Sequence, residues 1–197
     1  CAEMYLELGK SLNLHPAPRL VEELRTIKDG EELVRIKASC ALNHAVYDVL
    51  RPQLVPGLTE RDVAWMLEKA FRDGGAESLS FAPIVGFGPN GALPHATPGA
   101  ARLESEVPVL IDMGGRLDGY CSDQTRTWWI GDRPTDEFRR TLDLVREAQR
   151  LAIAKVGPGV GTDELHATAR EFFVRHGVDG HFTHSLGHGI GLETHEA

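Results

Sequence analysis

The chain has 197 residues, enough for one domain with a substantial hydrophobic core. Its 42% hydrophobic and 25% charged residues are ordinary for a globular protein and exclude a disordered chain. The net charge of −8 argues against binding to nucleic acid or to an anionic membrane surface. Because no apolar run is long enough to span a membrane and no signal peptide is visible, we expect a cytoplasmic protein.

The N-terminal stretch predicts a tail rather than part of the main domain. Residues 4–12 predict a short helix, which the Pro-rich stretch 15–18 ends. The chain begins without Met and ends within a motif, so we expect a fragment. Residues 1–18 are therefore expected to be the tail of a preceding N-terminal domain with its linker, and residues 19–197 one incomplete domain. The three cysteines are odd in number and widely spaced, which predicts reduced thiols: Cys1, Cys40 and Cys121.

Two amphipathic helices are expected next. Asp29 is typical of a helix start, and an apolar pattern at helical spacing then runs to Pro52. Thr59 or its neighbour caps a second helix, which Gly74 ends, and Trp65 within that helix is expected to pack. The apolar face expected of the first helix consists of Leu33, Ile36, Cys40, Tyr47 and Leu50.

A β-hairpin with two carboxylates is the central feature of the sequence. After a predicted strand over residues 81–88, residues 109–130 read as a hairpin carrying Asp112 and Asp123 on its two arms. If the turn is centred between residues 117 and 118, the two acids face each other with Cβ atoms roughly 4.5–5.5 Å apart. A pair of divalent cations would relieve their repulsion and supply hydrolytic chemistry. The alternative is a solvated hairpin with incidental acids.

The second half of the chain repeats the first. Helices are expected from about residue 135 to 156 and again after the Gly-Pro-Gly turn at 157–159. A shift of 102 positions places Pro56-Gly57 on Pro158-Gly159 and aligns the apolar positions of both helix pairs. Identities are few, so chance register of two amphipathic helix pairs is the alternative. A genuine repeat predicts that the second half lacks its hairpin.

Histidines gather near the end of the chain. His184, His188 and His195 stand among glycines, which allow close backbone approach, and imidazole is a common ligand for divalent metals. His95 adds another ring from the first half. Several rings could line one cleft, although each ring alone could equally be an ordinary polar residue.

Three stretches together resemble one family. Residues 88–99 (GPNGALPHATPG), 112–127 (DMGGRLDGYCSDQTRT) and 184–196 (HSLGHGIGLETHE) resemble the pita-bread metallopeptidases, which include methionine aminopeptidase, prolidase and aminopeptidase P. The first and third stretches, with the lead-in RTIKDGEELVRIKASC, look closest to the Xaa-Pro peptidase branch. The resemblance implies an α+β pita-bread fold of two pseudo-twofold related αα-β-hairpin halves, with residues 19–197 as an incomplete catalytic domain.

The resemblance also implies a site. Asp112 resembles the ligand of one metal, Asp123 the bridging ligand and His188 the single imidazole ligand, while Thr125 would support them. Two further ligands of the family, both glutamates, lie on a later hairpin that this sequence does not reach; Glu193 and Glu196 do not match them. Family histidines that line the substrate site correspond to His95, His184 and His195.

The resemblance implies a metallopeptidase that hydrolyses Xaa-Pro peptides with two divalent ions, Mn²⁺ first, with Co²⁺ or Zn²⁺ as alternatives. We expect a homodimer, because the unfilled second half should expose apolar faces and a sheet edge. The residues leave dipeptidase or aminopeptidase action open. The competing hypotheses are a metal-free, creatinase-like hydrolase and a non-catalytic binding protein on the same scaffold.

Overall fold

The computed structural model describes residues 2–15 and 17–196, so Cys1 lies outside the described residues. The helices are α1 (Ala2–Leu8), α2 (Leu20–Thr26), α3 (Gly30–Leu50), α4 (Glu60–Asp73), α5 (Asp136–Lys155) and α6 (Thr162–Arg175), with 3-10 turns η1 (Arg51–Gln53), η2 (Gly88–Ala92) and η3 (Asp179–His181). The strands are β1 (Ser78–Leu79), β2 (Ile84–Phe87), β3 (Val107–Met113), β4 (Gly115–Leu117), β5 (Tyr120–Cys121) and β6 (Gln124–Ile130). Within the described residues, no helix combines the length and the apolar character that a membrane span needs.

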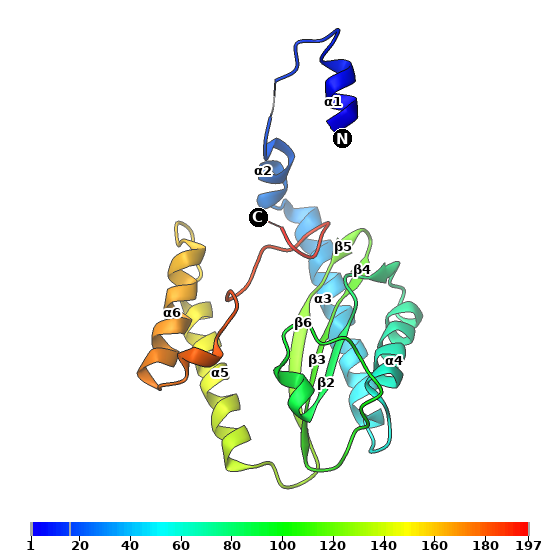
Figure 1. The fold of residues 1–197 in the computed structure, drawn as a ribbon, viewed down its shortest axis with the longest axis vertical. Coiled ribbons are helices and arrows are strands. Elements are labelled where there is room, and N and C mark those ends of the chain that lie inside the picture. Colours follow the sequence, from blue (N-terminus) through cyan, green and yellow to red (C-terminus); the bar gives the residue numbers. More distant parts are fainter. Residues whose placement is uncertain (1, 16, 197) are drawn as a thin grey trace.

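The predicted hairpin forms a long antiparallel ribbon at the centre of the molecule (Figure 1). One three-stranded sheet has the order β2-β3-β6, and a smaller one, β1-β4-β5, continues it toward the turn. A Cβ atom at Gly114 would lie 1.8 Å from the Ser122 carbonyl oxygen, so only glycine allows the two arms to approach so closely here.

The register of the ribbon differs from the expected one. Its turn is made by Asp118 and Gly119, both with positive φ, rather than being centred between residues 117 and 118. Asp112 therefore pairs with Thr125, and Asp123 is the diagonal neighbour of Asp112 on the same face. The prediction that the two carboxylates lie directly opposite each other is wrong, although they still share one face.

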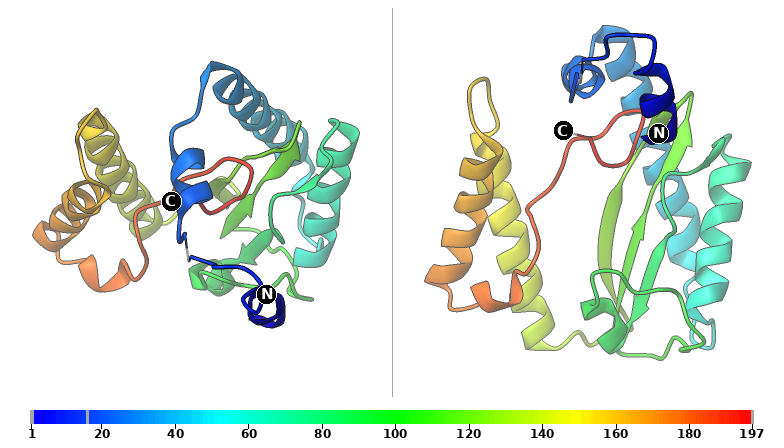
Figure 2. Two further views of the ribbon diagram at one scale, coloured as in Figure 1. Left: turned by 90° about the horizontal axis from the view of Figure 1, so that it is seen from above. Right: turned by 45° about the horizontal axis from the view of Figure 1, so that its top comes forward.

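Helices α3 and α4 cover one face of the main sheet (Figure 2). Alternate residues of β3 point into this core, and Val109, Ile111 and Met113 are buried there. Between them, Leu110 and Asp112 take the opposite face. The helix starts follow the predicted caps, because Asp29 and Thr59 each form a capping box.

Several finer expectations were wrong. Leu33 is 45% exposed, and α3 instead buries the polar residues Ser39 and Asn43 against the hairpin. Trp65 is 66% exposed and does not pack into the core. The predicted strand over residues 81–88 is shorter, because Gly88 begins η2.

The repeat is present in the helices. A shift of 102 positions carries α4 onto α6 without change of length, and Gly57 and Gly159 both have positive φ. Helices α5 and α6 pack on each other around a small cluster of their own. Figures 1 and 2 show this pair beside the sheet, with the C-terminal segment running from α6 back toward α2 and β5.

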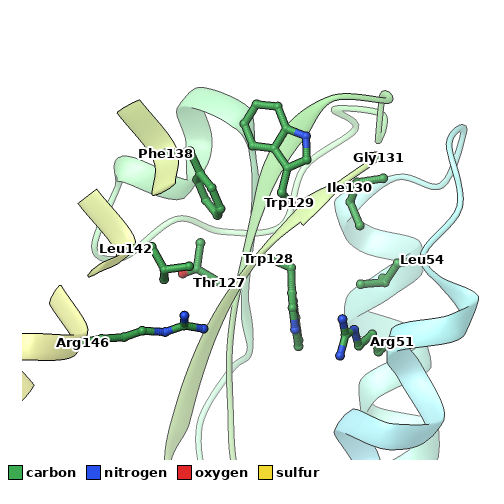
Figure 3. A pocket seen from close by; sticks show the side chains of 10 residues that line it. All are labelled: Arg51, Leu54, Thr127, Trp128, Trp129, Ile130, Gly131, Phe138, Leu142 and Arg146. Atoms are coloured by element: carbon green, nitrogen blue, oxygen red, sulfur yellow. The ribbon is translucent and has the colours of Figure 1, made fainter. Parts of the chain in front are cut away.

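A cavity of about 320 Å³ lies between β6 and α5 (Figure 3). The cavity is lined by Ile130 at the C-terminal end of β6, which pairs with Val107. Asp112 pairs with Thr125 near the other end of β6, so the cavity lies away from the two carboxylates. In the view of Figure 3, Arg146 extends from α5 toward Thr127, and Arg51 lies on the other side of the strand. Among the described strands, β6 pairs only with β3, so its other edge faces this cavity.

Candidate active site

The two hairpin carboxylates lie at one end of the main sheet, with Thr125 beside them. The Thr125 hydroxyl donates a hydrogen bond of 2.7 Å to Asp112 Oδ1. Burial raises the pKa of Asp123, and the negative charge of Asp112 raises it further. Burial and the Asp112 charge both make it costly for Asp123 to ionise beside Asp112. A cation between the two carboxylates would offset this cost, because it is attracted by both.

Tyr47 of α3 supports the carboxylates from the core side of the sheet. Its hydroxyl lies 3.1 Å from the Ile111 carbonyl oxygen and 3.0 Å from that of Gln124, so one buried phenol joins the two strands just beside Asp112 and Asp123. Burial raises the pKa of Tyr47, and the two aspartates add to the rise. Tyr47 therefore stays a neutral donor and holds the ribbon in register.

The C-terminal segment brings two imidazoles to these acids. His188 Nε2 lies 3.3 Å from Asp123 Oδ2. The ring of His195 is tilted over that of His188, with ring centroids 4.1 Å apart. The positive charge that either ring acquires on protonation would favour the ionised form of Asp123. Residues separated by more than 60 positions in the sequence thus meet at Asp123.

The loop that carries these histidines is anchored to the hairpin. The Cys121 amide, two residues before Asp123, donates to the Gly191 carbonyl over 2.7 Å. The Thr194 hydroxyl donates to the Ser80 carbonyl over 2.9 Å. The loop is closed on itself by a bridge between Gly189 and Glu196.

A part-buried ion triad, defined as Arg25, Lys28 and Glu196, ties the same loop to the last turn of α2 and to the residues that join α2 to α3. Arg25 Nη2 lies 2.5 Å from Glu196 Oε1, and Lys28 Nζ lies 2.9 Å from Oε2. The Glu196 side chain is 5% exposed. Burial alone would raise the pKa of Glu196, but the hydrogen bonds from Lys28 and Arg25 outweigh it and lower the pKa to about 2.

His95 stands on an exposed loop that follows η2. Glu60, 1% exposed at the start of α4, ties both ends of this loop. Its carboxylate accepts hydrogen bonds from the amides of Phe87 (3.1 Å) and Gly99 (2.8 Å) and from Asn90 Nδ2 (2.8 Å). The loop crosses the face of the sheet that carries Asp112, because a Cβ at Gly91 would lie 3.3 Å from Leu110 Cβ on that face.

His184 lies apart from this group. Its ring packs edge-on against Phe182, with centroids 5.1 Å apart, and its Nδ1 lies 2.7 Å from the Ser185 carbonyl oxygen. It lines an open cavity of about 580 Å³ together with His166 and Arg170 of α6. The structure thus gathers Asp112, Asp123, Thr125, His188 and His195, whereas the described contacts of His184 are elsewhere.

The donor types fit a divalent cation, since carboxylate oxygens and one imidazole suit Mn²⁺, Co²⁺ or Zn²⁺. The arrangement is nevertheless incomplete. Within residues 2–15 and 17–196, no group of three or more His, Cys, Asp or Glu side chains is placed to hold a metal ion. Two close pairs do form, Asp123 with His188 and Asp123 with Asp112, and Asp123 belongs to both.

Comparison with known proteins identifies the family. The sequence model of metallopeptidase family M24 matches residues 34–197, which include every candidate residue of the site. The chain belongs to metallopeptidase family M24. Its mixed helix and sheet fold is the pita-bread fold of that family, and membership implies the use of divalent metal ions.

The similar proteins of this family are longer than this chain. An uncharacterised peptidase of Staphylococcus epidermidis is 35% identical over 193 residues, which cover 96% of this chain and 55% of the relative. The prolidase of Pyrococcus furiosus superposes with a TM-score of 0.86 at 36% identity over 90% of this chain and 52% of its own. The X-Pro aminopeptidase of Thermotoga maritima gives 0.92 at 33% identity over 100% of this chain and 55% of its own. The chain therefore spans about half the length of the relatives it matches.

The tertiary structure adds residues to this M24 site that sequence reasoning did not select. In the sequence, Arg25 and Lys28 belong to the lead-in before the first predicted helix of the domain, and Glu196 is weighed only as a metal ligand. Because the partners in the ion triad are separated by 168 and 171 positions, no local pattern could reveal the contact. Glu60 carried a local signal as the first helical residue after the Thr59 cap, but its burial depends on a loop that follows later in the chain.

Proposed function

We propose that the protein is a metal-dependent peptidase that hydrolyses Xaa-Pro peptides, and that Asp112, Asp123 and His188 hold its divalent ions. The observation that carries the proposal is the meeting at Asp123 of a hairpin carboxylate pair and the His188 imidazole from the other half of the chain. The printed names of the similar structures, prolidase and X-Pro aminopeptidase, support the substrate class. The activity is proposed for the whole protein, because this chain spans about half the length of the relatives it matches.

Each residue of the site has a chemical role in this proposal. Two bound divalent ions, Mn²⁺ first, would supply Lewis acidity and a nucleophile derived from water. Thr125 orients Asp112 through its 2.7 Å hydrogen bond, so that one carboxylate oxygen stays free for a cation. His195 or His95 donates a hydrogen bond to the oxyanion that develops on the scissile carbonyl. His184, whose described contacts are with Phe182 and Ser185, is proposed as a substrate-site residue of the whole protein.

Metal binding by the chain itself is the first test. The Asp123→Asn variant keeps the size of the side chain but removes the negative charge that lies beside Asp112 and His188. We therefore expect its Mn²⁺ affinity, measured by titration calorimetry, to fall at least tenfold. Asp143→Asn on the exposed face of α5 is the matched control and should leave the affinity unchanged. Equal affinity in the chain and in the Asp123 variant would refute the ligand assignment.

Hydrolysis is the second test and uses the full protein. With Mn²⁺ present, we expect an Ala-Pro dipeptide or an Ala-Pro-initiated peptide to be cleaved at least tenfold faster than the corresponding Ala-Ala peptide. Cleavage of the dipeptide alone assigns dipeptidase action, and cleavage of the longer peptide assigns aminopeptidase action. Hydrolysis that persists after chelation would favour the metal-free, creatinase-like alternative, and the absence of hydrolysis would favour a binding protein.

We also propose that the chain self-associates through the unpaired edge of β6. The support is the edge strand itself, with the cavity of Figure 3 beside it, since unpaired strand edges readily accept another strand. Light scattering should detect a dimer of the chain, and Thr127→Lys, which places a charge on this edge, should shift the equilibrium toward monomer. A monodisperse monomer at all concentrations would contradict the proposal.

A further inference from the structure

The ion triad has an unusual place in the molecule. Glu196 follows His195 directly, whereas Arg25 in the last turn of α2 and Lys28 just before α3 lie 171 and 168 positions earlier in the chain. The distances of 2.5 Å and 2.9 Å are those of charge-assisted hydrogen bonds, and each carboxylate oxygen has its own cation. The triad is therefore a specific contact between two segments far apart in the sequence rather than one of many interchangeable surface pairs.

The loop held by the triad is weakly packed otherwise. From Leu192 to Glu196 the chain forms bends and one isolated bridge instead of a helix or a strand of a sheet. Its other described attachments are hydrogen bonds to Cys121 and Ser80 and the longer contact of Glu193 with Arg25. Segments with few buried apolar contacts open at low free energy, so removal of the triad should release this loop before the core of the molecule unfolds.

Release of the loop would have a chemical consequence. His188 and His195 lie at the two ends of the stretch that folds back through the Gly189–Glu196 bridge. The contact between His188 and Asp123 thus depends on the docking of this stretch against the hairpin. Arg25 and Lys28 act on the site from outside it, because neither contacts Asp112 or Asp123 in the described structure.

We infer that Glu196 is a positioning residue: through Arg25 and Lys28 it holds the loop 189–196 on the hairpin and so keeps His188 and His195 beside Asp123. The segment that precedes α3 is therefore a working part of the site rather than a passive connection. The consequence for metal binding rests on the proposed function, whereas the docking of the loop does not.

Hydrogen exchange of the chain without metal tests the docking, and NMR detects it at the Cys121 and Glu196 amides, which bond to Gly191 and Gly189. We expect Glu196→Lys to accelerate both amides at least tenfold while the Ile111 amide in β3 keeps its rate. The triple variant Arg25→Glu/Lys28→Glu/Glu196→Lys restores opposite charges and should recover most of the protection. Glu193→Lys is the matched control, because this side chain is 69% exposed on the same loop and lies 3.6 Å from Arg25; it should change the rates less than twofold.

Unchanged exchange in Glu196→Lys, or a triple variant that exchanges as fast as the single one, would overturn the inference. If Glu196→Lys does not fold, Glu196→Gln should give a smaller acceleration of the same two amides. Mn²⁺ affinity provides the second readout: we expect a loss of at least fivefold in Glu196→Lys and recovery in the triple variant. If the unmodified chain binds no Mn²⁺, the proposed function fails, but the exchange rates still decide the docking.

Discussion

The two helix pairs of this chain have the same plan but a different amount of support. Helices α4 and α6 coincide under a shift of 102 residues, yet α4 packs on a sheet and α6 packs mainly on α5. Phe71 is fully buried, and its counterpart Phe173 keeps 8% of its surface exposed. Amphipathic patterning therefore suffices to define the helices, whereas the sheet determines how much each helix stabilises the fold.

Truncation of the two equivalent phenylalanines, Phe71 and Phe173, should show the largest difference in stability between the two helix pairs. We expect Phe71→Ala to lower the free energy of unfolding by about 3–5 kcal/mol, because it removes a ring from a filled core. Phe173→Ala should cost less than half as much, since α5 and α6 form a small cluster of their own. Urea unfolding followed by circular dichroism measures both. Equal losses would mean that the two pairs are supported alike.

The starts of α4 and α6 offer a second comparison. Glu60→Ala leaves three donors of the His95 loop without their acceptor, so we expect a loss of about 3 kcal/mol and rapid exchange of the Gly99 amide. The counterpart of Glu60 is Thr162, an exposed residue, and Thr162→Ala should stay within about 0.5 kcal/mol. A neutral Glu60→Ala would show that the buried carboxylate does not hold this loop.

The ion triad, which has no counterpart in the first half among the described residues, predicts a pH dependence. Because the pKa of Glu196 is lowered from 4.5 to about 2, its contribution is complete above pH 4.5 and is lost as the pH falls toward 2. The shift corresponds to at most roughly 3 kcal/mol, and we expect about 2 kcal/mol because both cations are partly solvated. The stability difference between the chain and Glu196→Gln should shrink over this range in urea titrations. A constant difference would contradict the assignment.

The smallest effect is expected on the outer face of α4. Trp65 is 66% exposed, so Trp65→Ala should change the free energy of unfolding by less than about 0.5 kcal/mol. The same urea titration measures it. A loss above about 1 kcal/mol would mean that the indole packs after all, as the sequence alone had suggested.

Local chemistry explains which parts of the fold were predictable. Asp29, Thr59 and Thr135 start their helices as the sequence indicates, because a cap needs only the residues of one turn. The hairpin was also predictable, but its register was missed. A turn at Asp118-Gly119 instead of one position earlier moves Asp123 from directly opposite Asp112 to the diagonal.

The candidate site was also predictable only in part. Its residue types and motifs, with Asp112, Asp123 and His188 foremost, are present in the sequence, and comparison with known proteins places them in family M24. The metal-ligand roles stay a prediction, because the described residues form no three-donor group.

By itself the sequence determined the helices, the hairpin and the residues with chemistry suited to a divalent cation, because caps, periodicity and motifs act over a few residues. Only the tertiary structure decided that Glu196 meets Arg25 and Lys28 and that Glu60 closes the loop of His95. These are contacts between charged or polar groups far apart in the chain, and their strength depends on burial and distance. Neither quantity exists until the chain has folded.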